Sequence, residues 1–235
     1  MLIIDKNNIN SIDNWQELAS LHGFSILINK VPTWTSFDVV AKLRNVLQIK
    51  KIGHCGTLDP FANGLLILSC GKATKTISYF QDLPKQYKAT LKLGATTKTL
   101  DPESEEENIT DISHIKNIDI ENAVKCFIGE IQQVPPMFSA KKIKGQRLYE
   151  LARKNIEIEL KPVPVRIHNI EILDIKFPFV ELLIDCSKGT YIRSLARDIG
   201  NKLQVGGYLT SLSRTAIGEY KLESALTIDD ITKKI

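Results

Sequence analysis

The chain has 235 residues, of which 43% are hydrophobic and 25% are charged, and its formal net charge at pH 7 is +4. A chain of this length and hydrophobic content can bury one large α/β domain, with or without a small insertion. The apolar run at residues 65–68 is far too short to cross a bilayer, and no basic stretch followed by an apolar segment opens the chain, so we expect a cytoplasmic protein with no membrane contact.

The cysteines and histidines show no spacing typical of a metal centre or of a disulfide framework. The sequence has no Cys-x-x-Cys pair and no two-histidine motif, so we expect no metal and, for most of the cysteines, buried thiols. The residues concerned are Cys55, Cys70, Cys126, Cys186, His22, His54, His114 and His168.

Charge is distributed unevenly along the chain. Residues 101–107 carry five acidic side chains, a pattern typical of a solvated surface. Lys141, Lys142, Lys144 and Arg147 form a compact basic cluster that could either be solvated or bind phosphate, and the sequence by itself leaves both open.

Residues 1–23 are polar and weakly patterned, so we expect a peripheral N-terminal extension, with Trp15 and Leu18 as candidates to dock on the core, in front of a single domain over residues 24–235. Hydrophobic periodicity predicts the elements of the first half of that domain. They are a strand at 25–28, a helix capped by Thr35 or Ser36 and extending to 47, a strand at 64–70, a helix at 72–81, a strand at 86–94 and an exposed insertion at 95–118.

The second half of the domain has two strands in succession, which is not the regular alternation of a parallel β-α-β fold. The expected elements are helices at 120–127, 146–154 and 191–202, strands at 131–134, 165–175, 179–187 and 208–213, and a terminal helix capped by Thr227. This order favours an antiparallel or mixed sheet flanked by helices and disfavours a dinucleotide-binding fold.

The octapeptide Gly53-His54-Cys55-Gly56-Thr57-Leu58-Asp59-Pro60 places one carboxylate in a loop between glycines and a proline. Glycine permits backbone conformations closed to other residues, and Pro60 biases Asp59 toward an extended conformation, so the carboxylate is held outside a regular helix. Taken alone, this loop is either an active-site loop or a plain turn.

A second octapeptide, Lys188-Gly189-Thr190-Tyr191-Ile192-Arg193-Ser194-Leu195, decides between these readings. Together with the Asp59 loop it resembles the TruB family, the bacterial tRNA pseudouridine-55 synthases. Other matching segments extend the resemblance over roughly residues 24–217. They are Lys30 with Thr35-Ser36, and residues 71–75, 87–89, 134–136, 139–142, 145–153 and 212–214.

The resemblance implies a pseudouridine-synthase fold of the α+β type, with a mixed, mostly antiparallel central sheet flanked by helices. It also implies isomerisation of uridine 55 in the T-loop of tRNA, in which the N-glycosidic bond is cut and the base is rejoined to the ribose through C5. The implied enzyme needs no cofactor and binds the T-arm of tRNA with the target base flipped out. We expect a monomer without an obligate protein partner.

Three residues take catalytic roles by this resemblance. Asp59 matches the essential aspartate, which would attack C1′ of the ribose or C6 of the base, or assist a glycal route. Arg193 matches the arginine that pairs with this carboxylate, and a neighbouring guanidinium favours the ionised aspartate. Tyr87 matches the aromatic residue that stacks on the target base.

Further residues match substrate-binding positions of the family. His54 matches a histidine that contacts RNA near the gap left by the flipped base, and Tyr191, Leu212 and Lys30 correspond to other pocket positions. On this reading Lys141, Lys142 and Arg147, together with Lys144, Lys85 and Lys88, neutralise RNA phosphates.

The match has four departures and leaves two alternatives. Cys55 stands where threonine is common, and Asn155 where glycine often ends the helix. Val31 separates Lys30 from Pro32, whereas the family usually has Lys-Pro, so the turn there is expected to differ. Many members continue into an RNA-binding PUA domain, but this chain ends at Ile235, so we expect the catalytic domain alone. The alternatives are a non-catalytic tRNA-folding chaperone, and a hydrolase in which Asp59 and His54 act as an acid/base pair.

Overall fold

The computed structural model describes residues 2–139, 142–143, 146–148, 156 and 158–235. The chain divides into two compact units, the first formed by Met1–Lys88 and Leu212–Ile235 and the second by Ala89–Ser211. Two strands, β5 (Lys85–Leu93) and β13 (Gly207–Ile217), contribute residues to both units. Among the described residues, no helix combines the length and the apolar character needed to span a membrane.

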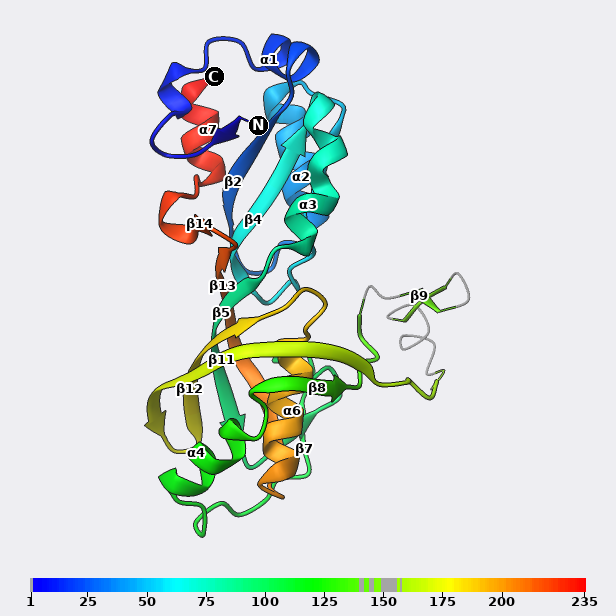
Figure 1. Ribbon diagram of the computed structural model, residues 1–235, viewed down its shortest axis with the longest axis vertical. Coiled ribbons are helices and arrows are strands. Elements are labelled where there is room, and N and C mark those ends of the chain that lie inside the picture. The colour runs from blue at the N-terminus through cyan, green and yellow to red at the C-terminus, as the bar shows by residue number, and fades with distance from the viewer. Residues whose placement is uncertain (1, 140–141, 144–145, 149–155, 157) are drawn as a thin grey trace. The chain divides into compact units, whose positions relative to one another are not determined.

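In the first unit, helices pack against strands (Figure 1). Besides its parts of β5 and β13, it consists of β1 (Ile3–Ile4), η1 (Ile9–Ser11), α1 (Trp15–Leu21), β2 (Phe24–Lys30), α2 (Ser36–Leu47), β3 (Ile52–His54), β4 (Asn63–Cys70), η2 (Gly71–Thr76), α3 (Ile77–Asp82), β14 (Tyr220–Lys221), η3 (Leu222–Ser224) and α7 (Ile228–Lys234).

The strands of this unit pair in both directions. β2 and β4 are antiparallel from Phe24 opposite Cys70 to Lys30 opposite Gly64, and β3 and β4 are antiparallel as well. β1 is parallel to β2, and β4 is parallel to β13 at the pair Gly64 and Arg214. The C-terminal end of β13 also forms an antiparallel pair with β14.

Strands β2 and β4 are buried on both faces, which explains why their sequences read as continuous apolar runs. Alternate residues such as Ile26 and Leu66 belong to a core cluster with residues of α1, α2 and α7, whereas Leu27 and Leu65 belong to a cluster that includes Phe80 of α3. The helices α1, α2 and α7 therefore cover one face and α3 covers the other.

The N-terminal segment differs from the expected peripheral extension. Ile4 and Trp15 are part of the core, and β1 adds a parallel edge strand to β2. Lys234 Nζ donates to Asn10 O at 3.2 Å, and Figure 1 shows both ends of the chain in this unit. Docking of Trp15 and Leu18 on the core is confirmed, whereas no periodicity indicated that Ile4 is buried, because the apolar residues of this segment are separated by polar ones.

In the first unit, α2 begins as the sequence predicts, whereas the helix expected at 72–81 differs. The side chain of Thr35 accepts from Asp38 N and that of Asp38 accepts from Thr35 N, so the predicted cap of α2 is confirmed as a capping box. The single helix expected at 72–81 is instead a 3-10 segment, η2, followed by α3.

The second unit packs two helices against strands (Figure 1). Besides its parts of β5 and β13, it consists of β6 (Thr96–Thr97), β7 (Glu106–Glu107), α4 (Asn117–Lys125), β8 (Gly129–Gln133), β9 (Lys142–Ile143), β10 (Gln146–Arg147), β11 (Val163–Lys176), β12 (Phe179–Cys186) and α6 (Ile192–Lys202). The strand order is β13-β5-β12-β11-β8, and β11 is antiparallel to both β12 and β8. The two adjacent late strands expected from the sequence are thus confirmed as a hairpin.

Two expectations for this unit need correction. Residues 102–118 are largely exposed, but Ala95, Thr97, Thr99 and Asp101 are buried, so an exposed insertion at 95–118 and a fully solvated acidic run are both wrong at their first residues. The helix expected at 146–154 is wrong at its start, because Gln146–Arg147 form β10, and most of its remainder lies outside the described residues. The chain is a mixed α/β protein with a central sheet flanked by helices.

Candidate active site

The Asp59 loop connects β3 to β4, which pair with each other, so it is the turn of an antiparallel hairpin. Gly56 adopts a φ of 119°, in the region that favours glycine, and opens the turn. Asp59 is partly exposed, whereas Leu58 before it is 3% exposed. The loop thus buries its apolar residue and leaves Asp59 partly accessible.

Arg214 of β13 holds the first part of this loop. Its Nη2 donates to Gly56 O at 3.3 Å, its Nη1 donates to Thr57 O at 3.4 Å, and its Nε donates to Leu65 O of β4 at 2.8 Å. The guanidinium is buried and connects the loop to the strand that follows it.

Ser36, the first residue of α2, holds the centre of the loop. Its Oγ accepts a hydrogen bond from Leu58 N at 2.9 Å and donates to Leu58 O at 3.3 Å. Asp59 O then accepts from Ala62 N at 3.1 Å. The peptide groups on both sides of the Asp59 α-carbon are therefore fixed by the protein.

Lys30, the last residue of β2, holds the end of the loop. Its ammonium donates to the carbonyl oxygens of Val31 at 3.0 Å, Trp34 at 2.6 Å and Pro60 at 3.2 Å. Pro60 O also accepts from Thr33 N at 2.8 Å. Lys30 is 1% exposed, so three carbonyl oxygens take the place of water around a buried charge.

Burial lowers the pKa of Lys30 to about 8, and this effect exceeds that of Asp59, whose negative charge raises the same pKa. The positive charge of Arg214 lowers it further. Lys30, Arg214 and Asp59 are therefore electrostatic neighbours within one unit, and the two cations favour the ionised form of the carboxylate.

His54 and Cys55 precede the turn. Burial, followed by the charge of Arg214, lowers the pKa of His54, which favours a neutral imidazole at neutral pH. Burial raises the pKa of Cys55 to about 11, and its thiol lies 3.4 Å from Ser69 Oγ, so it is the packed thiol that the sequence predicted.

Tyr87 and Leu212 belong to the same unit as Asp59 but lie on other strands, β5 and β13. Tyr87 is 9% exposed and Leu212 is 7% exposed, so each presents only an edge to solvent. The first unit thus contains five of the predicted residues: Lys30, His54, Asp59, Tyr87 and Leu212.

Arg193, in the first turn of α6, belongs to the second unit and is 3% exposed. Its Nη1 donates to Asp101 Oδ2 at 2.9 Å and to Thr99 O at 2.8 Å, and its Nη2 donates to Phe138 O at 2.7 Å. Both side chains of the ion pair are buried, at 4% exposure for Arg193 and 2% for Asp101. A pairing of Arg193 with Asp59 stays a prediction.

Tyr191 lies at the N-cap of α6 in the second unit. Gln133, which is fully buried, accepts from Tyr191 N at 2.8 Å and donates to Tyr191 O at 3.1 Å. The main chain of this residue is therefore fixed by the end of β8, which is a second anchor for the segment that carries Arg193.

The predicted phosphate-binding residues are described only in part. Lys141 and Lys144 lie outside the described residues, and Lys142 and Arg147 lie in β9 and β10. Lys85 is 8% exposed and donates to the carbonyl oxygens of Phe80, Gln81 and Leu83, so the expectation that it neutralises a phosphate is wrong. Lys88 is exposed, as a phosphate contact requires.

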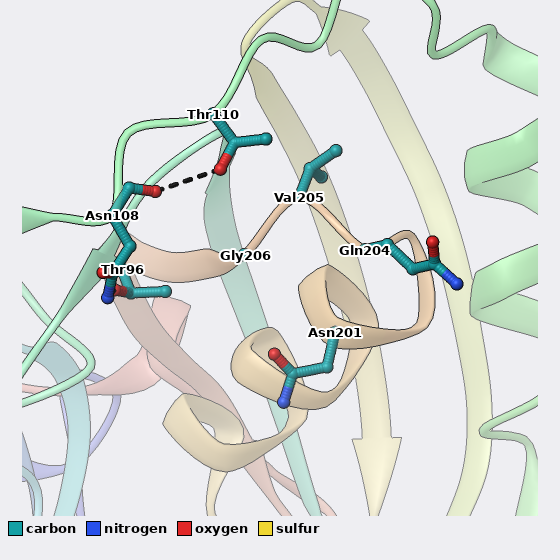
Figure 2. A pocket seen from close by; sticks show the side chains of 7 residues that line it. All are labelled: Thr96, Asn108, Thr110, Asn201, Gln204, Val205 and Gly206. Atoms are coloured by element: carbon teal, nitrogen blue, oxygen red, sulfur yellow. Dashed lines mark hydrogen bonds between the residues drawn. The ribbon is translucent and has the colours of Figure 1, made fainter.

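A cavity of about 380 Å³ lies in the second unit, and none of the residues that line it is a predicted site residue. Thr96, Asn108 and Thr110 form one wall, where Asn108 Nδ2 donates to Thr96 Oγ1 at 2.9 Å. Figure 2 shows the amides of Asn201 and Gln204 pointing in different directions, so the polar groups do not converge on one ligand. The described residues also contain no group of His, Cys, Asp and Glu side chains placed to hold a metal ion.

Sequence reasoning assigned no role to three residues of this site: Ser36, Asp101 and Arg214. Arg214 and Ser36 lie in segments that carry the family resemblance, which marked both segments as part of the family pattern. The sequence did not show their contacts, because these contacts join residues far apart in the chain. Asp101 was hidden in an acidic run that is otherwise exposed. A carboxylate placed among threonines, at Thr97 and Thr99, was the one local sign of burial.

Comparison with protein-family models gives two matches that meet end to end. The TruB family pseudouridylate synthase N terminal domain matches residues 44–192, and the tRNA pseudouridylate synthase B C-terminal domain matches residues 193–235. The first match alone covers the Asp59 loop, Tyr87 and Tyr191, and the second begins at Arg193.

Curated relatives are similar over most of their length. A protein of Bacteroides fragilis is 49% identical over 87% of this chain and 90% of its own, and one of Chlorobaculum tepidum is 47% identical over 93% of each. A protein of Clostridium tetani is 46% identical over 89% of this chain and 72% of its own. All three are named tRNA pseudouridine synthase B.

Solved structures show similar folds. The structure described as a Cbf5-Nop10-Gar1 complex superposes with a TM-score of 0.71 and 28% identity over 95% of this chain and 57% of the solved one. A structure of an H/ACA RNP bound to a substrate RNA containing 2′-deoxyuridine gives a TM-score of 0.68 and 28% identity, over 92% of this chain and 54% of the solved one. The chain thus spans little more than half the length of these solved chains.

Proposed function

The chain belongs to the TruB family of pseudouridylate synthases and isomerises uridine in tRNA, and we propose that its target is position 55 of the T-loop and that Asp59 is its nucleophile. The reaction breaks the bond from N1 of uracil to C1′ of ribose and forms a bond from C5 to C1′. The proton on C5 leaves, and N1 gains one, so atoms and electrons balance without an oxidant, a reductant or a second substrate.

The single observation that supports Asp59 most strongly is the way its loop is held. Each carbonyl oxygen from Gly56 to Pro60 accepts a hydrogen bond, from Arg214, Ser36, Ala62 N or Lys30. A nucleophile gains from being held near its attack geometry before the substrate arrives. The neighbouring Lys30 charge would favour the ionised carboxylate that nucleophilic attack requires.

The buried guanidinium of Arg193 supports its proposed role as the second charged group of the site. Asp101 and two carbonyl oxygens hold it on one side, so its direction is set by the protein rather than by substrate. We infer that it pairs with Asp59 during the reaction, and that Asp101 is the residue that orients it.

Base flipping explains the remaining residues. A flipped uracil needs a flat, immobile surface, and Tyr87, which is 9% exposed on β5, has the restricted mobility that stacking requires. Tyr191 and Leu212 would enclose the base, and a neutral His54 would contact the RNA by a hydrogen bond. Lys30 supports the loop instead of touching substrate, since its ammonium is fully occupied by protein carbonyls.

RNA binding would rest on cationic side chains. Lys88, together with Lys141, Lys142, Lys144 and Arg147, would neutralise phosphates of the T-arm. We further infer a pseudouridine-synthase fold with a mostly antiparallel sheet, a cytoplasmic location and a monomer. The second function that the sequence left open, an RNA chaperone without catalysis, would use the same surface.

Incubation with an unmodified tRNA transcript, followed by mapping of pseudouridine, tests the proposed function. The protein should modify position 55, and Asp59→Asn should bind the transcript with unchanged affinity but form no product. Turnover by Asp59→Asn would remove Asp59 as the nucleophile. A protein that binds tightly and modifies no uridine would instead be the chaperone.

A further inference from the structure

Arg214 is the largest fully buried side chain of the described part of the chain, at 1% exposure. An arginine stays charged at any physiological pH, so its burial is costly unless its donors are satisfied. All of its hydrogen-bond partners in the described part of the chain are neutral main-chain carbonyls, at Leu65, Thr57 and Gly56. Packing alone does not explain why a buried guanidinium donates to three main-chain carbonyl oxygens.

The backbone of Arg214 is fixed by its contact with Gly64, at the opposite end of the residue from the loop. Arg214 pairs with Gly64 in the parallel ladder between β13 and β4. A Cβ atom at Gly64, whose φ is 105°, would lie 2.5 Å from Arg214 O and 2.7 Å from Arg214 N. The close approach of these two residues therefore depends on glycine at 64. It holds the start of the Arg214 side chain, on β13, rigidly beside β4, the strand that follows the loop.

The far end of the same side chain meets the loop before Asp59. Gly56 and Thr57 lie outside any helix or strand, so no regular secondary structure satisfies their carbonyl oxygens. The two Nη atoms of the planar guanidinium reach both of them while Nε stays on Leu65 O, and the single nitrogen of a lysine would not reproduce this fixed spacing of donors.

We propose that Arg214 is a positioning residue for the isomerisation, which fixes the backbone at Gly56 and Thr57 and so sets the direction of the Asp59 carboxylate. This inference rests on the proposed function, because it needs Asp59 as the reacting group. Arg214 acts through the loop and touches no substrate. Besides burial, its positive charge also lowers the pKa of Lys30 and of His54, two further residues of the same site.

The test compares Arg214→Met and Arg214→Lys with the unchanged protein, using an unmodified tRNA transcript and steady-state rates. A displaced nucleophile loses rate but not substrate affinity, so kcat of Arg214→Met should fall about 100-fold while KM stays within about threefold. Arg214→Lys restores a buried charge but not the fork, so its kcat should stay at least about tenfold low.

A matched control separates positioning from general destabilisation. Leu43 is fully buried in the α2 face of the first unit and makes no contact with loop carbonyls, so Leu43→Ala lowers the melting temperature without freeing the loop. Assayed well below its melting temperature, Leu43→Ala should keep kcat. Amide hydrogen exchange at residues 56–62 should accelerate in Arg214→Met and not in Leu43→Ala.

The outcomes distinguish this inference from the proposed function. If the unchanged protein forms no pseudouridine, or if Asp59→Asn remains active, the proposed function fails. If Asp59→Asn is inactive but Arg214→Met keeps kcat, or loses activity only to the extent that an equally destabilised Leu43→Ala does, the positioning role of Arg214 is wrong. A fall in kcat with unchanged loop exchange would also overturn it.

Discussion

The Nζ atom of Lys30 lies 3.2 Å from the carbonyl oxygen of Pro60, the residue directly after Asp59. The buried end of β2 is thereby tied to the loop that carries the carboxylate, and the charge of Asp59 acts on the same ammonium. Structure and electrostatics are coupled here, because a proton on Lys30 provides both the third hydrogen bond and the positive charge.

Lys30 should make the stability of the protein rise with pH on the alkaline side. Its pKa is about 8 in the folded protein, against an ordinary value of 10.5, so between these values the unfolded state binds more protons, and the free energy of unfolding increases with pH. The contribution should be on the order of 2 kcal/mol. Urea unfolding at pH 7 and pH 10 measures it.

Lys30→Met is the reference for this measurement, since all other titrating groups are shared and cancel in the difference. The unfolding free energy of the unchanged protein minus that of Lys30→Met should increase as pH rises from 7 to 10. A difference that is constant over this interval would mean that Lys30 titrates normally.

Ser36 should matter to both stability and rate. Ser36→Ala leaves the buried Leu58 N–H and C=O without their partner, which costs about 1–3 kcal/mol, and it loosens the peptide before Asp59. We expect kcat to fall about tenfold with KM unchanged. Urea unfolding and steady-state rates on a tRNA transcript measure the two effects.

Ser25→Ala is the matched control for Ser36. Ser25 is fully buried in β2 and lies 2.9 Å from Ser69 Oγ, so its removal also breaks a buried hydroxyl contact, but one that is not made to the loop. The two variants should lose similar stability and differ in kcat. Equal rates for both would remove Ser36 from the positioning of Asp59.

Sequence patterns predicted the parts of this site that are local. The capping box of α2, the apolar strand β4 and the glycine-rich turn each follow from a few neighbouring residues, and all three are present. Burial of an arginine, a lysine and an aspartate was not predictable in this way, because Arg214 meets Gly56 across 158 positions of sequence. Polar residues acquire such partners only in the folded chain.

The same reasoning explains the errors at the N-terminus and in the acidic run. Ile4 is buried because β1 pairs with β2, and Asp101 is buried because Arg193 of α6 meets it, 92 positions later in the chain. In each case a weak local pattern was overruled by a contact with a distant element. The family resemblance predicts the reacting residues, and the structure added the residues that hold the Asp59 loop and Arg193.

Binding of tRNA should weaken as salt increases. Lys88 and the basic residues near 141–147 would release counterions from phosphates, with a slope of about −0.7 in log K against log salt for each single-stranded phosphate neutralised. Fluorescence titration of a tRNA transcript between about 50 and 200 mM salt measures this slope. Lys88→Ala should reduce its magnitude by about one contact, whereas Lys85→Met, at a buried lysine, should leave it unchanged.

The ion pair of Arg193 and Asp101 should be strongly coupled, since both side chains are almost fully buried. Asp101→Asn removes a buried counter-ion of the Arg193 guanidinium and should cost about 3–5 kcal/mol of unfolding free energy, and Arg193→Met should remove the cation that pairs with the buried Asp101 carboxylate, at a similar cost. The double variant removes both charges, so it should be more stable than the sum of the single losses predicts. Urea unfolding of the four proteins closes this cycle, and additive losses would show that the two residues do not act as a pair.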